Sequence, residues 1–335
     1  MEIDKSDMRK IIMDFPSQFK KGLKAASNVS LKHYRLVSPP NNIIICGMGG
    51  SALPGEILVN LRPLNFFIHK SYGLPPQAGG GSIIICVSYS GNTEETLSAF
   101  KEALKRKLPA IAITTGGELA KIAKKNNIPL VLLPALHIQP RLALGLQFAA
   151  LLQILTNHYL MPDSFVSEIT KLETALNPKN LESKGKALAR KIGKRIPLIY
   201  TPEKLKGLGL VLKNNFNENA KTLAFSNHIP EMNHNEIVGF WQIGKKKIKD
   251  DIIAIILRDK KENPKILKRT KIMENIFETE GVKTEIIDIG NKDVLETIFS
   301  TTLLGLWASY YLALDYKIDP TQTKIIEEIK KKLNK

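Results

Sequence analysis

The sequence is poor in cysteine and contains no long uninterrupted apolar run. Its 335 residues include only two cysteines, Cys46 and Cys86, and both lie in apolar runs that predict buried strands. Isolated cysteines of this kind usually behave as small hydrophobic residues, so we expect free thiols rather than a disulfide. No stretch of 18 apolar residues is present, which argues against a transmembrane helix. The N-terminus lacks the apolar core of a signal peptide, so we expect a cytoplasmic protein with no membrane partner.

Acidic residues are in the minority. Lys and Arg number 49 against 32 Asp and Glu, which gives a net charge of +17. The lysines are scattered along helical segments, and clusters such as 245–247 and 330–332 are short. This distribution argues against a nucleic-acid-binding arm. It suits a lysine-rich solvated surface, and the same positive field would steer an anionic substrate toward the protein.

Short apolar runs alternate with helical patterns in both halves of the chain. Strands are predicted at 42–46, 66–69, 83–87, 110–114, 130–133, 196–200, 252–257 and 284–287. Helices are predicted at 51–61, 93–107, 142–159, 203–221, 265–280 and 293–314, with a C-terminal helix after Asp319-Pro320. Strands that are apolar on both faces, each followed by a helix, are typical of parallel sheets covered on both sides. We therefore expect an α/β protein with two doubly wound subdomains around a central cleft.

The break in this pattern at Met161-Pro162-Asp163-Ser164 predicts the domain boundary. We expect an N-terminal domain at 1–160 and a C-terminal domain at 165–335. The similar order of strands and helices in the two halves suggests a duplicated domain.

A glycine-rich segment, Gly47-Met48-Gly49-Gly50-Ser51, follows the first strand and opens a helix. Glycines let the backbone approach an anion, and a helix N-terminus offers unpaired N–H groups, so the segment suits a phosphate. With Ala52, which follows Ser51, it also matches the dinucleotide fingerprint G-x-G-x-x-A. However, 67–71 contains no acid to hold a ribose, and the Gly-Lys-Ser/Thr of a Walker loop is absent. A tight strand–helix turn without a ligand is the alternative.

A second polar loop, Ser88-Tyr89-Ser90-Gly91-Asn92-Thr93, also lies between a strand and a helix. Two such loops at the carboxyl ends of strands in one sheet predict a phosphate cradle, because hydroxyls and backbone amides bind a dianion by charge-assisted hydrogen bonds. The alternative is an ordinary helix cap by Ser90 or Thr93. The predicted substrate-binding residues of these loops are Gly49, Gly50, Ser51, Ser88, Ser90 and Thr93.

The loop pair resembles the sugar isomerase (SIS) domain, a flavodoxin-like fold. Four further segments resemble, in order, those of the bifunctional phosphoglucose/phosphomannose isomerase family: Gln139-Pro140-Arg141-Leu142, Asn217-Glu218-Asn219-Ala220-Lys221, Pro230-Glu231-Met232-Asn233-His234-Asn235-Glu236 and Asp319-Pro320-Thr321. The resemblance implies an aldose–ketose isomerase that interconverts glucose 6-phosphate and mannose 6-phosphate with fructose 6-phosphate. It implies a cis-enediolate intermediate and neither a metal nor another cofactor.

The resemblance also implies roles for individual residues. Glu218 would be the base that moves a proton between C1 and C2, a task that suits a carboxylate. His234 would act at the ring oxygen and would come from the partner subunit, which implies a homodimer. Arg141 would stabilise the enediolate oxygens. Read without the resemblance, these are a solvated helix glutamate, a surface histidine and a surface arginine.

The C-terminal segment departs from the family pattern. Gln322 and Thr323 stand where the family usually has proline and valine. Thr323 would lie near C2 and C3 of the sugar, where a small side chain leaves room for both epimers. The lysine that helps to open the ring falls at Lys330, beside Lys331 and Lys332.

Two other classes of protein share some of these features. A SIS-type regulatory module would bind a phosphosugar without chemistry and would not need Glu218, His234 and Arg141. An oxidoreductase built on the glycine-rich loop lacks the ribose acid. A zinc site at His228 and His234 matches no common spacing. We therefore expect sugar 6-phosphates as partners, and no nucleic acid.

Overall fold

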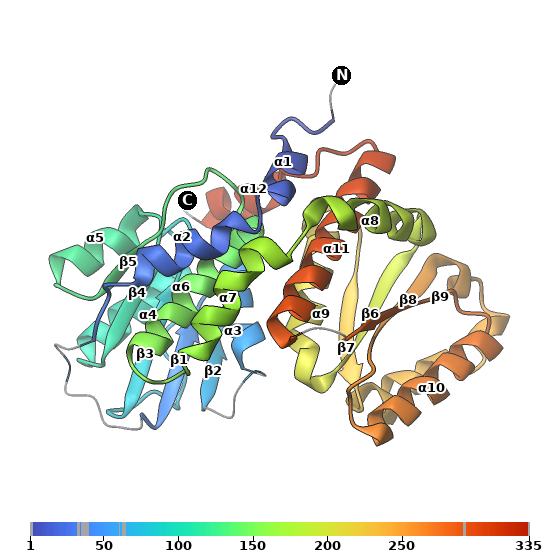
Figure 1. The fold of residues 1–335 in the computed structure, drawn as a ribbon, viewed down its shortest axis with the longest axis horizontal. Coiled ribbons are helices and arrows are strands. Elements are labelled where there is room, and N and C mark those ends of the chain that lie inside the picture. The colour runs from blue at the N-terminus through green and yellow to red at the C-terminus, as the bar shows by residue number, and fades with distance from the viewer. Residues whose placement is uncertain are drawn as a thin grey trace. The chain divides into compact units, whose positions relative to one another are not determined.

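The computed structural model describes residues 3–31, 34, 40–59, 61, 65–290 and 293–333. The chain divides into two compact units, which are described separately (Figure 1). One unit is Asp14–Leu176, and the other combines Met1–Met13 with Asn177–Lys335. Each unit is a parallel sheet with helices packed against it, as the sequence predicted.

The boundary between the units lies later than the predicted break at Met161–Ser164. Helix α7 (Ser164–Ala175) stays with the first unit because it packs on α2 (Ser17–Ala26) and α6 (Leu144–Asn157). The first 13 residues belong to the second unit, where α1 (Met8–Met13) packs on α11 (Val294–Asp315) and α8 (Pro178–Ile192). The two units therefore differ from the predicted domains, 1–160 and 165–335, in where the first unit begins and where it ends.

The first unit contains a five-stranded parallel sheet in the order β2-β1-β3-β4-β5. Its strands are β1 (Asn42–Cys46), β2 (Phe66–His69), β3 (Ser82–Val87), β4 (Ala110–Thr114) and β5 (Leu130–Leu132). This is the flavodoxin-like order, in which the chain reverses direction across the sheet between β1 and β3. Ligands bind such sheets outside the carboxyl ends of the strands at this switch point.

Helices cover both faces of this sheet, which explains its isoleucine-rich strands. On one face, Ile44, Cys46, Ile84 and Cys86 pack against α4 (Glu94–Lys105) and α5 (Gly117–Lys125). On the other, Ile45 packs against α3 (Leu53–Leu58) at Gly55. Both cysteines are buried free thiols, as predicted. Helix α3 is shorter than the predicted 51–61, and it begins later because a 3₁₀ turn at Gly49–Ser51 precedes it.

The second unit contains a four-stranded parallel sheet in the order β7-β6-β8-β9. Its strands are β6 (Ile196–Pro202), β7 (Phe225–Ile229), β8 (Ile252–Asp259) and β9 (Thr284–Ile289). The order repeats the arrangement of the first four strands of the first unit, which agrees with a duplicated domain. Strand β7 has no apolar pattern in the sequence, because its central residues, Ser226, Asn227 and His228, are polar and it lies at the sheet edge.

The remaining helices of the second unit are α9 (Lys206–Asn219), α10 (Pro264–Thr279) and α12 (Lys324–Leu333). Helix α11 is long and apolar enough to span a membrane by length and composition, although no uniform apolar run marked it in the sequence. However, 78% of its most apolar stretch is buried inside the structure, and the indole of Trp307 donates to the carbonyl oxygen of Pro178 at 2.8 Å. Its packing against α8 and α9 is that of a core helix.

Candidate active site

The glycine-rich loop after β1 lies at the switch point of the first sheet. A Cβ atom on Gly47 would lie 2.8 Å from the carbonyl oxygen of Ser51 and 3.0 Å from that of Val87, so the main chain at this turn is too close-packed for a side chain. Gly49 has a φ of +49°, a left-handed conformation that glycine adopts without steric cost. The hydroxyl oxygen of Ser51 accepts from the N–H of Tyr89 at 3.1 Å, which ties this loop to the loop after β3.

The loop after β3 is organised by its own hydroxyl groups. Ser88 is fully buried, and its hydroxyl donates to the hydroxyl oxygen of Thr93 at 3.0 Å and accepts from the N–H of Gly91 at 3.1 Å. Thr93 occupies the N-cap position of α4, but its side chain makes no capping hydrogen bond. Ser90 is exposed, and its hydroxyl oxygen accepts from the N–H of Asn92 at 3.3 Å. The simple helix-cap interpretation therefore does not describe Thr93.

Arg141 lies against the glycine-rich loop. It belongs to a 3₁₀ turn, Pro140–Ala143, ahead of α6, and only 2% of its surface is exposed. A Cβ atom on Gly50 would lie 2.5 Å from the backbone nitrogen of Arg141 and 2.8 Å from its Cα atom. The fold of the first unit thus brings Arg141 to the predicted phosphate loop, although Arg141 lies 91 positions after Gly50 in the sequence.

A third loop, which the sequence analysis did not single out, supports the second. Thr115 follows β4, and its hydroxyl donates to the carbonyl oxygen of Tyr89 at 2.7 Å. The side-chain oxygen of Asn92 accepts from the N–H of Glu118 at 3.0 Å. In the sequence, the run Thr114-Thr115-Gly116-Gly117 after an apolar strand could have indicated this third loop. These contacts hold the loop at Ser88–Thr93 against the loop that follows β4.

In the second unit, the structure brings Glu218 and Thr323 into one cavity. Glu218 lies in the last turn of α9, and Thr323 directly precedes α12. Both residues line a cavity of about 420 Å³, together with Asn217, Lys221, Ile318, Asp319, Gln322, Lys324, Ile325 and Ile326. A carboxylate and a small hydroxyl side chain from segments about 100 residues apart therefore share a space of small-molecule size.

His234 lies on an anchored but exposed loop. It ends the 3₁₀ turn Glu231–His234 after β7. The next turn is held by Glu236, whose two carboxylate oxygens accept from the Tyr200 hydroxyl and from the Asn227 side-chain amide, both at 2.6 Å. Burial, reinforced by this carboxylate, raises the pKa of Tyr200 well above its ordinary value, so the phenol stays protonated and donates. The loop is thus fixed to β6 and β7.

Neither His234 nor Lys330 lines the cavity that contains Glu218 and Thr323. Lys330 lies on α12, which has no buried residue and exposes Ile325, Ile326, Ile329 and Leu333. His228 is paired with Glu203, with its Nε2 atom 2.6 Å from the carboxylate. Within the described ranges, no group of three or more His, Cys, Asp or Glu residues is arranged to hold a metal ion.

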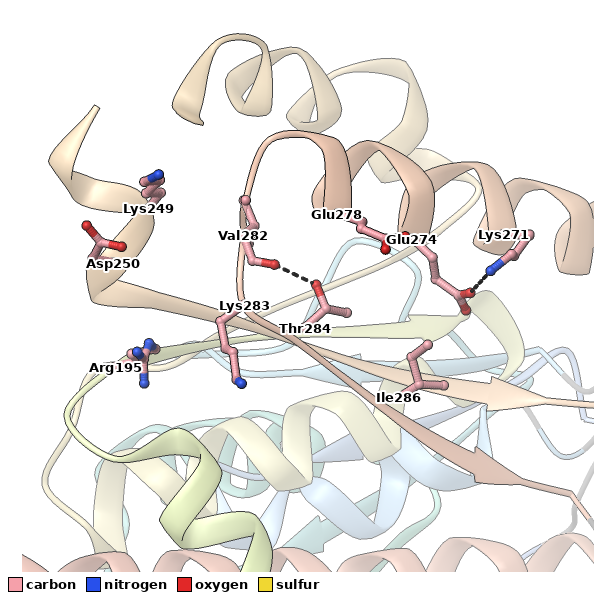
Figure 2. Close-up of a pocket in the computed structure, with 11 residues that line it drawn as sticks. Arg195, Lys249, Asp250, Lys271, Glu274, Glu278, Val282, Lys283, Thr284 and Ile286 are labelled. Carbon is pink, nitrogen blue, oxygen red and sulfur yellow. Dashed lines mark hydrogen bonds and ion pairs between the residues drawn. The ribbon is translucent and has the colours of Figure 1, made fainter. Parts of the chain in front are cut away.

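A separate cavity of about 580 Å³ lies at the amino ends of β6 and β9 (Figure 2). Arg195, Lys249 and Lys283 line it, but so do Asp250, Glu274 and Glu278. None of the predicted site residues belongs to it. Its mixed charges partly pair with one another and with neighbours, as between Lys271 and Glu274 at 3.3 Å.

Comparison with known proteins gives a consistent family. Residues 181–333 match the bacterial phospho-glucose isomerase C-terminal SIS domain. The chain is 32% identical to a bifunctional phosphoglucose/phosphomannose isomerase of Aquifex aeolicus over 89% of this chain and 92% of that protein. It is 30% identical to a D-glucosamine-6-phosphate 4-epimerase of Sulfolobus acidocaldarius over 88% of this chain and 90% of that protein.

The fold is also similar to solved structures. The C-terminal domain of glucosamine-fructose-6-phosphate aminotransferase from Francisella tularensis matches with a TM-score of 0.70 at 13% identity, over 94% of this chain and 97% of that one. At this identity the likeness shows the fold alone. The sequence identity to the Aquifex protein over nearly the whole chain carries the assignment: the chain belongs to the bifunctional phosphoglucose/phosphomannose isomerase family.

Proposed function

We propose that the protein interconverts fructose 6-phosphate with glucose 6-phosphate and mannose 6-phosphate, without a metal. The observation that carries this proposal is the pair of joined loops at the β1/β3 switch point, in a chain of this isomerase family. The loops offer backbone N–H groups, hydroxyls and the N-terminus of α4. These are the groups that bind a phosphate monoester.

In the proposed reaction, Glu218 takes the C2 proton of the open-chain aldose. The C–H bonding electrons form the C1–C2 double bond while the carbonyl electron pair moves to O1, which gives the enediolate. The proton on O2 then passes to O1, and the carboxylic acid returns the first proton to C1 as the O2 electrons form the carbonyl group of the ketose. For the reverse direction the same group takes the C1 proton and returns it to C2. General-base catalysis of this kind is typically worth about 10²–10⁴-fold. Arg141 would stabilise the enediolate charge.

Ring opening precedes proton transfer, and we assign it to His234 and Lys330. An imidazole side chain can both donate and accept a proton, which suits exchange with the ring oxygen. Thr323, which shares a cavity with Glu218, would leave space for either configuration at C2. A single base and an unobstructed C2 together explain how one site would serve both epimers.

We further propose that the working form is a homodimer in which His234 serves the partner's site. Near His234, an apolar groove of about 610 Å³ is lined by Ile237, Val238, Trp241, Ile272 and Ile276, among others. Val238 is 67% exposed and Trp241 is 71% exposed. Exposed apolar surface of this kind is typical of a protein–protein interface, and a second copy would cover it.

The test is to incubate the protein with fructose 6-phosphate in the presence of EDTA and to identify the aldose products. D-Glucosamine 6-phosphate is supplied in parallel, because a relative of similar identity is named as an epimerase of that sugar. Glucose 6-phosphate and mannose 6-phosphate are the expected products. Binding without turnover would favour a regulatory module, and conversion of the amino sugar alone would favour the epimerase.

The matched variant is Glu218→Gln, which keeps the shape of the side chain but cannot accept a C–H proton. It should lose both epimer activities together and still bind the phosphosugar. Exchange of the C2 proton in deuterated water reports the step directly. Exchange at the wild-type rate, or loss of only one activity, would rule out Glu218 as the shared base.

A further inference from the structure

Lys221 joins the end of α9 to the segment that carries Thr323. Its ammonium group donates to the carbonyl oxygens of Glu218 at 2.9 Å, Asn219 at 3.2 Å and Asp319 at 2.8 Å. Three acceptors match the three protons of a lysine ammonium. Two of the oxygens belong to the last turn of the helix, and the third lies 98 residues from Lys221 along the chain.

The backbone at Lys221 adopts a conformation that is sterically costly for most residues. Lys221 has a φ of +52°, the left-handed conformation in which helices often end. Glycine or asparagine usually occupies such a position, because other residues meet a steric cost there. A cation beside the last carbonyls of a helix is favoured by the helix dipole. The three side-chain contacts and the helix dipole therefore both favour a lysine at this position.

Both segments that Lys221 joins contribute to the cavity that contains Glu218. The end of α9 is fixed to α11, since the side-chain amide of Asn219 donates to the hydroxyl oxygen of Ser309 at 2.9 Å and both residues are fully buried. The other segment forms a turn in which the Asp319 carboxylate accepts from the N–H of Thr321 at 2.9 Å. Thr323 follows this turn. Lys221 thus connects a fixed helix end to a turn that places Thr323.

We propose that Lys221 is a positioning residue, which holds Thr323 at the distance from the Glu218 carboxylate that accommodates both epimers. The inference rests on the proposed function, because it takes Glu218 as the base. Without the lysine, the turn at Asp319–Thr321 loses a charge-assisted link to α9. Misplacement by about 1 Å at a reacting centre costs about 10²-fold in rate.

The test is Lys221→Met, which keeps the length of the side chain and removes its donors. We expect kcat to fall by about 10²-fold with both aldoses. KM should stay near the wild-type value, because the predicted phosphate loops are remote in sequence and make none of these contacts. The ratio of glucose to mannose product should change, because Thr323 moves. The matched control is Lys317→Met, which removes an exposed lysine just before the same turn and should leave all three quantities unchanged.

A double-mutant cycle with Thr323→Ala separates positioning from a general loss of stability. If Lys221 acts through Thr323, Lys221→Met should change the product ratio in the wild-type background and not in the Thr323→Ala background. Wild-type kcat and product ratio in folded Lys221→Met, or equal changes in both backgrounds, would overturn the proposal. If Lys221→Met does not fold, the shorter, uncharged Lys221→Gln is measured, and wild-type values there overturn it equally. Full activity in Glu218→Gln would instead refute the proposed base.

Discussion

Gly50→Ala changes the predicted phosphate loop by a single methyl group at its closest contact. The new Cβ atom would lie 2.5 Å from the backbone nitrogen of Arg141 and 2.8 Å from its Cα atom, whereas ordinary contacts begin at 3.4 Å. Because the obstacle is main chain, no side-chain rotation relieves it. The loop and the turn at Pro140–Ala143 must separate by roughly 1 Å. Overpacking of this kind typically costs about 1–3 kcal/mol of stability.

The functional effect should exceed the effect on stability. Separating the loop from Arg141 by roughly 1 Å should lower kcat/KM by about 10²-fold, because both parts are proposed to act on one substrate. The assay is steady-state isomerisation of fructose 6-phosphate well below the unfolding temperature, with thermal unfolding measured in parallel. Gly80→Ala is the control, since a Cβ atom there would have nothing within 4 Å. Wild-type kcat/KM in Gly50→Ala would show that the contact with Arg141 has no part in the reaction.

Three further predictions concern binding, assembly and stability. The double variant Ser88→Ala, Thr93→Ala should raise KM for sugar phosphates, because each lost bond to a charged phosphate is worth about 1.5–3 kcal/mol; an unchanged KM would count against these loops as the phosphate site. Mixing inactive Glu218→Gln with inactive His234→Ala subunits should restore some activity through heterodimers, and no recovery after verified subunit exchange would contradict a shared site. Glu182 accepts from Arg9 and from the Tyr311 hydroxyl, and the hydrogen bond from Arg9 is the main reason that its pKa is lowered. Its contribution to stability is therefore present above the ordinary glutamate pKa and is lost as pH falls through the lowered value, so the stability difference between wild type and Glu182→Gln should shrink in acid; a constant difference in melts across that range would refute this.

Much of the secondary structure follows from the sequence because the strands are buried on both faces. The run Ile43-Ile44-Ile45 in β1, for example, is buried against helices on each side of the sheet, so its apolar pattern is continuous. The glycine- and serine-rich loops are also local signals, since their residue types are those that a tight turn and a phosphate require. The family motifs around Glu218 and His234 could likewise be recognised in the sequence alone.

Strand order, in contrast, is a property of the packed sheet. β2 lies between β1 and β3 in the sequence, yet β1 and β3 are neighbours, and only this pairing lets Ser51 accept from the N–H of Tyr89. The domain boundary at Leu176 likewise depends on tertiary packing, because α7 packs on α2 and α6 of the first unit.

The residue types available for phosphate binding and proton transfer can be recognised in the sequence, because they depend on local composition and motif. Which of these residues lie together depends on how the helices and strands pack. Arg141 reaches Gly50 because α6 packs beside α3, and Glu218 shares a cavity with Thr323 because α9 packs on α11. Lys221 reaches Asp319 for the same reason. Such contacts join residues about 90 to 105 positions apart, and the burial of apolar helix faces, which no local pattern specifies, brings them together.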